Sequence, residues 1–487
     1  MSKSILFLCG SPRGTASASR KTAQYMARFL DYDYEFVDVG RAKLSSDPTE
    51  AEPAYQAIVA KMRAADAIVW VFGAWFLFVP LDLQYLFDKL FTQREPDLRD
   101  KLAASVMTSA RVHDDLILER TQFVSEQLGM RYLGDVSAAG SPMIGYCDDE
   151  ETTEDSCRVL AQRIDRALAD GFKPARKHLP VDLALLSSAS RGEGFQADWP
   201  QADKTGDRTI LIVTGLPLAE SPAAKSTVEA IARTSKNKVE VLELADHKVG
   251  RCIGCYLCDF RVEGVCVVKD DYEAVKARLH KADAIVLIGV SSCGLVDSKL
   301  KALLDRSWGI AHRPTLEGRY GFAVAVGGGA MDSESALYLV GAQRAWGVKS
   351  IAGLGQGPDP DAFAGTLRQT VEDLDRALDE RWQVALRFSS IGAHLVFRDL
   401  ITNSGMALRA DYKYWKDKGF LRRPSTGGMN AVMRFAFRSE RMGNALMKSL
   451  KAQTLRKRDA RLSAYVSAGG KLGGGKDRGS TVSASPT

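Results

Sequence analysis

The chain has 487 residues, of which 45% are hydrophobic and 26% are charged, and its formal net charge is +6. This length allows two or three domains, and the composition is that of an ordinary globular protein rather than a secreted disulfide scaffold. The first residues show no basic and then apolar leader, and no apolar run reaches the roughly 18 residues of a membrane span. We therefore expect a reducing, cytoplasmic compartment, in which the 8 cysteines are metal or redox ligands rather than disulfides.

The chain begins with an alternation of strand and helix patterns. Residues 4–9 (SILFLC) form a short apolar run that ends at Gly10, and a helical pattern follows over Arg20–Leu30. Two further strands are predicted over Tyr34–Val39 and Ala67–Phe72. Strands that alternate with helices in this way indicate a parallel sheet with helices on both faces.

The same pattern returns in the second half of the chain. Strands are predicted over Thr209–Thr214, Lys238–Leu244 and Ala284–Gly289, and a helix over Lys225–Arg233. Gly10 and Gly215 are 205 positions apart, whereas Ala67 and Ala284 are 217 positions apart. The difference predicts an insertion between the second and third strands of the second half. We interpret the repeat as the duplication of a whole domain.

The predicted fold is α/β, with two tandem doubly wound parallel-sheet domains and a C-terminal helical extension. Composition and periodicity suggest a first domain (1–178), a linker (179–206), a second domain (207–380), a basic helical extension (381–465) and a disordered tail (466–487). The tail is assigned as disordered because it is rich in glycine and serine.

The positive charge of the chain belongs to its C-terminal region. Residues 381–487 hold 21 Lys+Arg against 6 Asp+Glu, whereas the other 380 residues hold 45 against 54. Such a region could contact anionic lipid, nucleic acid or an acidic partner, or could be a solvated helical face. Within it, Asn430–Lys457 mixes apolar and basic residues and could lie on a membrane surface or pack against the protein. We expect no sequence-specific binding of nucleic acid.

Hydroxyl groups gather between the first predicted strand and the first helix. Gly10 is followed by Ser11, Pro12 and Arg13, and then by Ser17 and Ser19. Backbone N–H groups at a helix N-terminus attract anions, and an arginine can add a charge-assisted hydrogen bond to a phosphate oxygen. The loop is therefore predicted to bind phosphate, with a turn that only caps the helix as the alternative.

Four cysteines lie within 15 residues in the predicted insertion, with the spacing C-x2-C-x2-C-x7-C. They are Cys252, Cys255, Cys258 and Cys266. Several thiolates that converge on a small volume suit an iron–sulfur cluster. A zinc site, reversible thiol chemistry and a loop without metal remain alternatives.

The first loop, with Ser11, Arg13, Ser17 and Ser19, resembles the phosphate loop of the NAD(P)H-dependent FMN reductases, which have a flavodoxin-like fold. Residues 251–289 and 299–306 resemble the iron–sulfur flavoprotein branch of that family, in which a compact cysteine motif holds a [4Fe–4S] cluster near FMN. The resemblance covers residues 1–175 and 207–380 and implies FMN, a [4Fe–4S] cluster and NAD(P)H as electron donor. Residues 409–420 are similar to a C-terminal extension of some flavodoxin-like reductases.

Other loops depart from the family pattern. Where the family has its flavin loop, the first half has Trp75 and Phe76, which could stack on the flavin ring or belong to the core. The remaining candidate flavin-binding residues come from the second half: Ser292, Cys293, Gly294, Gly327, Gly328 and Gly329. Cys293 could face the flavin or be a small buried residue. The second phosphate loop begins Gly215-Leu216-Pro217 and lacks the neighbouring serine and arginine.

These observations lead to one functional hypothesis. The first half would hold FMN and the second half a cluster, so that the chain forms a pseudo-dimer, or a homo-oligomer, that passes electrons from NAD(P)H to an acceptor. The acceptor could be a small molecule or a protein, and no catalytic acid or base is assigned, because the cofactors carry the chemistry. A non-catalytic electron carrier that docks through its basic region and a scaffold with decayed flavin sites are the alternatives.

Overall fold

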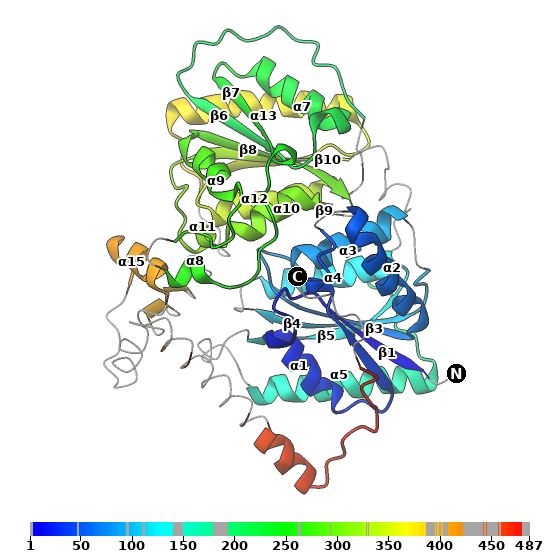
Figure 1. Cartoon of the computed structure of the whole chain (residues 1–487). Helices are drawn as coiled ribbons and strands as arrows, with labels where there is room; N and C mark the ends of the chain where they lie inside the picture. Colours follow the sequence, from blue (N-terminus) through cyan, green and yellow to red (C-terminus); the bar gives the residue numbers. More distant parts are fainter. Residues whose placement is uncertain are drawn as a thin grey trace.

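The computed structural model describes residues 3–45, 48–93, 97–109, 113–139, 150–178, 193–261, 264–292, 294–327, 329, 331–385, 395, 397–398, 401–402, 408–421, 442, 445, 456 and 459–479. Within them, two α/β domains follow one another along the chain and lie against each other, as Figure 1 shows. The predicted Cys293, Gly328 and most of the basic segment 430–457 lie outside the described residues.

The first domain is built on a parallel sheet with the strand order β2-β1-β3-β4-β5. Its strands are β1 (Ser4–Cys9), β2 (Asp33–Val37), β3 (Ala67–Gly73), β4 (Leu102–Ser109) and β5 (Arg131–Ala139). Its helices are α1 (Ala18–Ala27), α2 (Pro48–Ala64), α3 (Leu81–Gln93), α4 (Asp114–Gln127) and α5 (Glu150–Asp170). This strand order is that of flavodoxin-like folds, in which ligands bind at the carboxyl ends of the strands beside β1 and β3.

The second domain repeats this order as β7-β6-β8-β10-β11. Its strands are β6 (Thr209–Thr214), β7 (Lys238–Glu243), β8 (Ala284–Ser292), β10 (Tyr320–Val326) and β11 (Lys349–Gly355), and the short β9 (Leu295–Val296) pairs with the end of β8. Its helices are α7 (Pro222–Thr234), α8 (Leu257–Phe260), α9 (Tyr272–Lys281), α10 (Ser298–Arg306), α11 (Trp308–His312), α12 (Asp332–Ala345) and α13 (Pro360–Glu380). The predicted duplication and fold class are confirmed.

Strand residues alternate between two buried faces, as a parallel sheet covered on both sides requires. In β1, Ile5 and Phe7 pack against α1 and α5, whereas Leu6 and Leu8 point to the face covered by α2, α3 and α4. The second sheet divides in the same way between α7 and α13 on one face and α9, α10 and α12 on the other. The sheet face covered by α2, α3 and α4 and the sheet face covered by α9, α10 and α12 belong to one continuous hydrophobic core.

Corresponding glycines mark the same turn in both domains. Gly129 follows α4 with φ 88°, and Gly347 follows α12 with φ 90°. In each turn the next residue donates its N–H to a carbonyl five residues back, so that Met130 bonds Ser125 and Val348 bonds Gln343, both within 3.0 Å. Glycine is favoured there because its left-handed conformation ends a helix without a clash of Cβ.

Corresponding helices also meet where the domains touch, because α3 packs against α10. Gln84 Nε2 donates to the Val296 carbonyl at 2.7 Å, and Lys301 Nζ donates to the Trp75 carbonyl at 3.2 Å. Gln84 and Lys301 are 217 positions apart, which is the offset of the repeat. Lys301 is fully buried and forms an ion pair with Asp305, whose second oxygen accepts the Leu81 N–H at 3.0 Å.

The C-terminal region returns to both domains. The helix α15 (Arg409–Asp417) lies beside α8 of the second domain, and residues 459–479 lie along the first domain. We expected disorder from residue 466, but Tyr34 of the edge strand β2 accepts the Arg478 N–H at 2.9 Å and donates to the Lys476 carbonyl at 3.0 Å. Open backbone groups of the edge strand and the carboxylate of Asp33, 2.9 Å from Arg478, explain this attachment. None of the helices in the described part of the chain combines the length and the apolar character needed to cross a bilayer.

Candidate functional site

The predicted phosphate loop lies at the carboxyl end of β1, between that strand and α1. Ser17 is the N-cap of α1, because its Oγ accepts the Arg20 N–H at 3.0 Å, and it lies 3.3 Å from the Ser19 Oγ. Ser11 Oγ accepts the Arg13 N–H at 3.3 Å. The three serine side chains are buried and face a helix N-terminus. The loop therefore caps the helix and also gathers the polar groups that an anion needs.

Several donors of this loop remain without a partner within the described residues. The Ala18 and Ser19 N–H groups make no hydrogen bond there, and neither does the Arg13 guanidinium, which lies 5.7 Å from the centre of the Tyr256 ring. The nearby Asp38 carboxylate is bound by Arg20 at 2.8 Å and is thereby held away from the loop. These unused donors, together with a helix N-terminus, fit a phosphate group.

The cysteine segment of the second domain lies directly on this first-domain loop. Arg251 Nη1 donates to the Gly40 carbonyl and to Asp82 Oδ2, each at 2.5 Å. Gly254 has φ +68°, and a Cβ at this position would lie 2.8 Å from the Trp75 ring and 3.4 Å from Arg13 Cγ. Only glycine allows so close an approach. The structure therefore brings the cysteine motif and the candidate phosphate loop together across the domain boundary.

The four cysteines are free in this structure and are neither fully buried nor fully exposed. Burial raises the pKa of Cys252 to about 12, although hydrogen bonds from the Gly254 N–H and the Trp75 side chain oppose this shift. Burial also raises the pKa of Cys258 far above its ordinary value. Burial thus disfavours the thiolate form of both groups, and a bound cation would favour it.

The spacing of the sulfur atoms bears on the metal alternatives. A tetrahedral zinc ion holds each thiolate at about 2.3 Å, which sets neighbouring sulfurs about 3.8 Å apart. Among the described residues, the three ligand atoms within 4.8 Å of one another come from Asp259, His312 and Asp411, and the cysteines provide no such set. The choice between zinc and an iron–sulfur cluster therefore rests on the chemistry of four thiol ligands and not on their spacing in this structure.

The predicted aromatic residues of the first half lie at the domain boundary. Trp75 lies 6.0 Å from Tyr256 and 6.1 Å from Trp308, measured between ring centres. Phe76 packs against Trp346, and its carbonyl accepts the Tyr338 hydroxyl at 3.0 Å. Trp75 is therefore part of the surface on which the cysteine segment and the loop meet, whereas Phe76 belongs to the core between the domains.

Four candidate flavin residues of the second half are described, Ser292, Gly294, Gly327 and Gly329, and they lie at the carboxyl edge of the second sheet. Gly327 lies beside Ser291 and Asp332, and its N–H donates to Gln356 at 3.3 Å. The Gly329 carbonyl accepts the Asp332 N–H at 3.2 Å. Gly294 has φ +72° beside Met331, and Ser292 pairs with Leu295 in the short hairpin. These contacts are all with other residues of the second domain.

Carboxylates fill the second anion loop, which the sequence analysis did not foresee. Asp297 caps α10 by accepting the Leu300 N–H at 2.9 Å, and its carboxylate is so close to Gly215 that a Cβ there would clash with it. Glu243 Oε2 accepts the Leu218 N–H at 2.8 Å. Two acidic groups thus occupy the place of an anion and would repel a phosphate. The signal in the sequence was an aspartate directly before a helix.

A buried network attaches α15 to the cysteine segment. Asp411 of α15 accepts hydrogen bonds from Arg313 and, at 3.0 Å, from His312 Nδ1. Asp259, next to Cys258, lies 3.4 Å from the same arginine. Burial raises the pKa of Asp259 to about 6, against the influence of His312 and Arg313. Because Arg313 already supplies the positive charge between the carboxylates, we interpret this group as a structural ion pair and not as a metal site.

Sequence reasoning found the loop and the cysteines but missed the residues that join them. Arg251, Tyr256 and Trp308 surround the meeting point, and two of these lie within or beside the cysteine motif. Arg251 and Tyr256 could have been found in the sequence, because they are the neighbours of Cys252 and Cys255.

The comparisons with known proteins agree with this geometry. A family described as NADPH-dependent FMN reductase matches residues 4–141 and again residues 209–351. An iron–sulfur flavoprotein of Archaeoglobus fulgidus is 28% identical over 217 residues, which are 43% of this chain and 98% of that protein. An iron–sulfur flavoprotein of Methanocaldococcus jannaschii is 32% identical over 120 residues, which are 24% of this chain and 61% of that protein.

Among solved structures, the NAD(P)H:quinone oxidoreductase of Methanothermobacter marburgensis is 20% identical with a TM-score of 0.23, covering 34% of this chain and 96% of its own. The family match extends over more than half of the chain and falls once on each domain. The chain therefore belongs to the NADPH-dependent FMN reductase family and contains two copies of its domain in tandem.

Proposed function

We propose that this chain is an iron–sulfur flavoprotein that transfers electrons from NAD(P)H to an acceptor, with FMN on the first-domain loop and a [4Fe–4S] cluster on the four cysteines. The observation that carries the proposal is the close approach of Gly254 to Trp75 and Arg13, which brings the cysteine motif against the phosphate loop of the other half. Two redox groups in such contact can exchange electrons directly.

The first domain supplies what FMN needs. The unpartnered Arg13 guanidinium and the open N–H groups of Ala18 and Ser19 would bind the phosphate, with Ser11 and Ser17 lining the loop. Trp75 would limit access of water to the region between the loop and the cysteines. Bound FMN accepts two electrons together and releases them singly, and an iron–sulfur cluster moves one at a time.

Asp297 and Glu243 support a stoichiometry of one FMN per chain. Their carboxylates lie in the loop of the second domain, where a second phosphate would otherwise bind. The duplicated chain would thus be an unequal pseudo-dimer, in which one half holds the flavin and the other holds the cluster. The names of the curated relatives favour the cluster over zinc.

Anaerobic purification of the full chain tests the proposal. We expect about one FMN, four iron and four sulfide per chain, and bleaching of the flavin absorbance within seconds of adding NADPH or NADH. A chain without flavin would overturn the proposal. A flavin that stays oxidised until a protein partner is added would identify an electron carrier instead, and zinc without sulfide would replace the cluster.

A further inference from the structure

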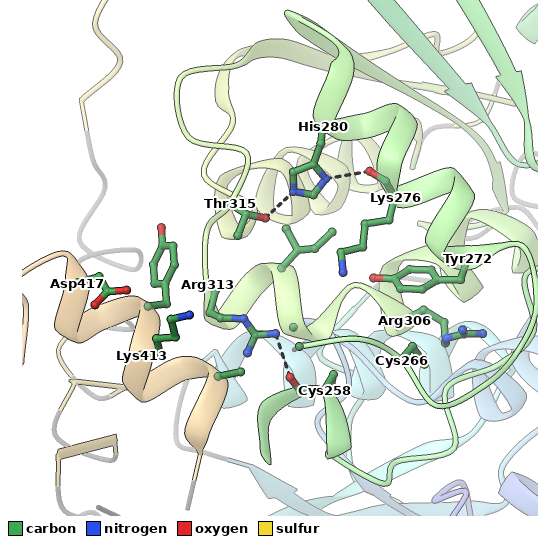
Figure 2. A pocket seen from close by; sticks show the side chains of 15 residues that line it. Cys258, Cys266, Tyr272, Lys276, His280, Arg306, Arg313, Thr315, Lys413 and Asp417 are labelled. Atoms are coloured by element: carbon green, nitrogen blue, oxygen red, sulfur yellow. Dashed lines mark hydrogen bonds between the residues drawn. The ribbon is translucent and has the colours of Figure 1, made fainter. Parts of the chain in front are cut away.

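A cavity lies beside the cysteine segment, between that segment and the helices α9 and α15. Its volume is about 300 Å³, at the lower end of the range for small-molecule sites. Cys258 and Cys266 form part of its wall, and α15 closes it on the opposite side. Figure 2 shows Lys276 and Tyr272 of α9 on one side and Lys413 and Asp417 of α15 on the other, with Arg313 between them.

The charges on this wall are mostly positive. Four cationic side chains and one carboxylate line the cavity: Lys276, Arg306, Arg313, Lys413 and Asp417. Arg306 is paired with Asp270 at 2.7 Å, Arg313 with Asp411, and Lys276 with Glu273 at 3.2 Å. Lys413, by contrast, makes no hydrogen bond or ion pair within the described residues. It is therefore the cation that remains available to a ligand.

The rest of the wall combines apolar, aromatic and small residues with His280 and Thr315. Tyr272, Ile310 and Tyr414 contribute rings and an alkyl group, and Gly264 and Gly309 contribute backbone without side chains. A Cβ on Gly309 would lie 2.5 Å from Arg313 and 3.5 Å from Cys258 Cβ, so glycine keeps this part of the wall open. His280 bonds Thr315 Oγ1 and the Lys276 carbonyl, both at 2.8 Å, so that both of its ring nitrogens have partners.

We propose that this cavity binds a small planar organic anion, with its acidic group at Lys413 and its ring toward Cys258 and Cys266. Lys413 offers the ligand a charge-assisted hydrogen bond, and the rings of Tyr272 and Tyr414 offer contact to a planar ligand. A role of this anion as electron acceptor rests on the proposed function, because it requires a cluster on the neighbouring cysteines. The binding itself is independent of that function.

The C-terminal extension gains a role from this site. Asp411 and Trp415 hold α15 in place, the first through Arg313 and His312 and the second through a hydrogen bond of its indole N–H to the His312 carbonyl at 2.9 Å. These contacts fix the helix that carries Lys413. The cysteine segment would thus stand between two binding sites, one from the first domain and one completed by α15.

Calorimetric titration of the anaerobically purified full chain, saturated with FMN, with 2-naphthoate tests the inference. Its neutral analogue 2-naphthamide should bind at least about tenfold more weakly, because it lacks the charge that Lys413 recognises. Lys413→Glu should weaken the binding of 2-naphthoate by at least about tenfold. Lys416→Glu makes the same charge change at an exposed position of the same helix, outside the cavity. It should change the affinity for 2-naphthoate by less than about twofold, because solvent and salt screen the charge.

The outcomes separate this inference from the proposed function. The proposed binding site is overturned if both lysine variants weaken the affinity for 2-naphthoate equally. It is also overturned if 2-naphthoate does not bind to the unmodified chain. If Arg13→Glu loses the binding of 2-naphthoate and Lys413→Glu keeps it, the probe occupies the first-domain loop. This result also overturns the inference. Binding that depends on Lys413 in a chain that contains no reducible flavin would retain the cavity and reject the redox function.

Discussion

The two anion loops of this chain began as copies of one structure and now differ in the sign of their charge. In the first loop the Asp38 carboxylate is bound by the buried Arg20 at 2.8 Å, and the Ala18 and Ser19 N–H groups have no acceptor among the described residues. Glu243 corresponds to Asp38 and Lys225 corresponds to Arg20 at the repeat offset of 205. Lys225 is exposed, 4.0 Å from Glu229, and leaves Glu243 to bond the loop N–H of Leu218.

A second pair of positions shows the same divergence. Pro80 precedes α3 in the first domain, and Asp297 stands at the corresponding place before α10, with its carboxylate against Gly215. A few side chains have thus removed an anion site without changing the sheet or its connections. The difference teaches that the two copies of this domain can keep one fold while the charge of their loops diverges and one copy acquires the cysteines. The following predictions test that division of labour.

The largest expected effect separates the two cofactors. Cys258→Ser should abolish the bound iron and sulfide nearly completely, because a cluster depends on its thiolates, while FMN content stays the same. Iron, sulfide and flavin assays on anaerobically purified protein check this. Cys157→Ser replaces a cysteine of the first-domain core and should leave all three contents unchanged. Loss of FMN together with iron in Cys258→Ser would contradict the separation.

The next effect concerns the helices that join the halves. Lys301→Ala leaves the buried Asp305 carboxylate without its ion pair and should lower the free energy of unfolding by about 3–5 kcal/mol. Gln84→Ala removes the corresponding neutral hydrogen bond to Val296 and should cost about 1–2 kcal/mol. Urea denaturation of both variants measures the difference. Equal losses would show that the interface does not distinguish the two halves.

Affinity for FMN should depend on the first loop alone. Arg13→Glu replaces the cation of the loop by an anion and should weaken FMN binding by about 10–100-fold, as measured by flavin fluorescence during reconstitution. Lys225→Glu makes the same exchange beside the second loop and should have no measurable effect. A comparable loss of FMN affinity in both variants would indicate that both loops bind flavin. The proposed difference between the two loops would then be wrong.

The smallest effect is a dependence of stability on pH. Burial raises the pKa of Asp297 to about 6 from its ordinary value of 3.8. Between these values the folded chain binds a proton that the unfolded chain does not, so the free energy of unfolding falls as pH rises through this window. From pH 5 to pH 7 this group should contribute a loss of about 1 kcal/mol.

Asp297→Asn isolates this contribution, because asparagine still caps α10 but does not titrate. Urea denaturation at the two pH values should show a smaller loss for the variant than for the unmodified chain. Identical losses would mean that Asp297 titrates at its ordinary pKa, and that the second loop does not bury a carboxylate.

Much of the fold could be predicted from local sequence. The apolar run Thr209–Thr214 is the strand β6 as predicted. The predicted strand Ala284–Gly289 is found as β8, which continues to Ser292. Short buried strands in a parallel sheet are recognisable because they are almost continuously apolar. The attachment of residues 466–479 could not be predicted, since composition indicates flexibility but does not reveal an open sheet edge elsewhere in the chain.

The sequence by itself determined the duplicated α/β pattern, the serine- and arginine-bearing loop and the four-cysteine motif, because each depends on residues that are neighbours along the chain. Only the tertiary structure decided that the cysteines of one half lie on the loop of the other, and that Asp297 and Glu243 close the second loop. These are contacts between residues separated by tens to hundreds of positions. Such contacts arise when buried faces pack into a common core, and no local pattern records them.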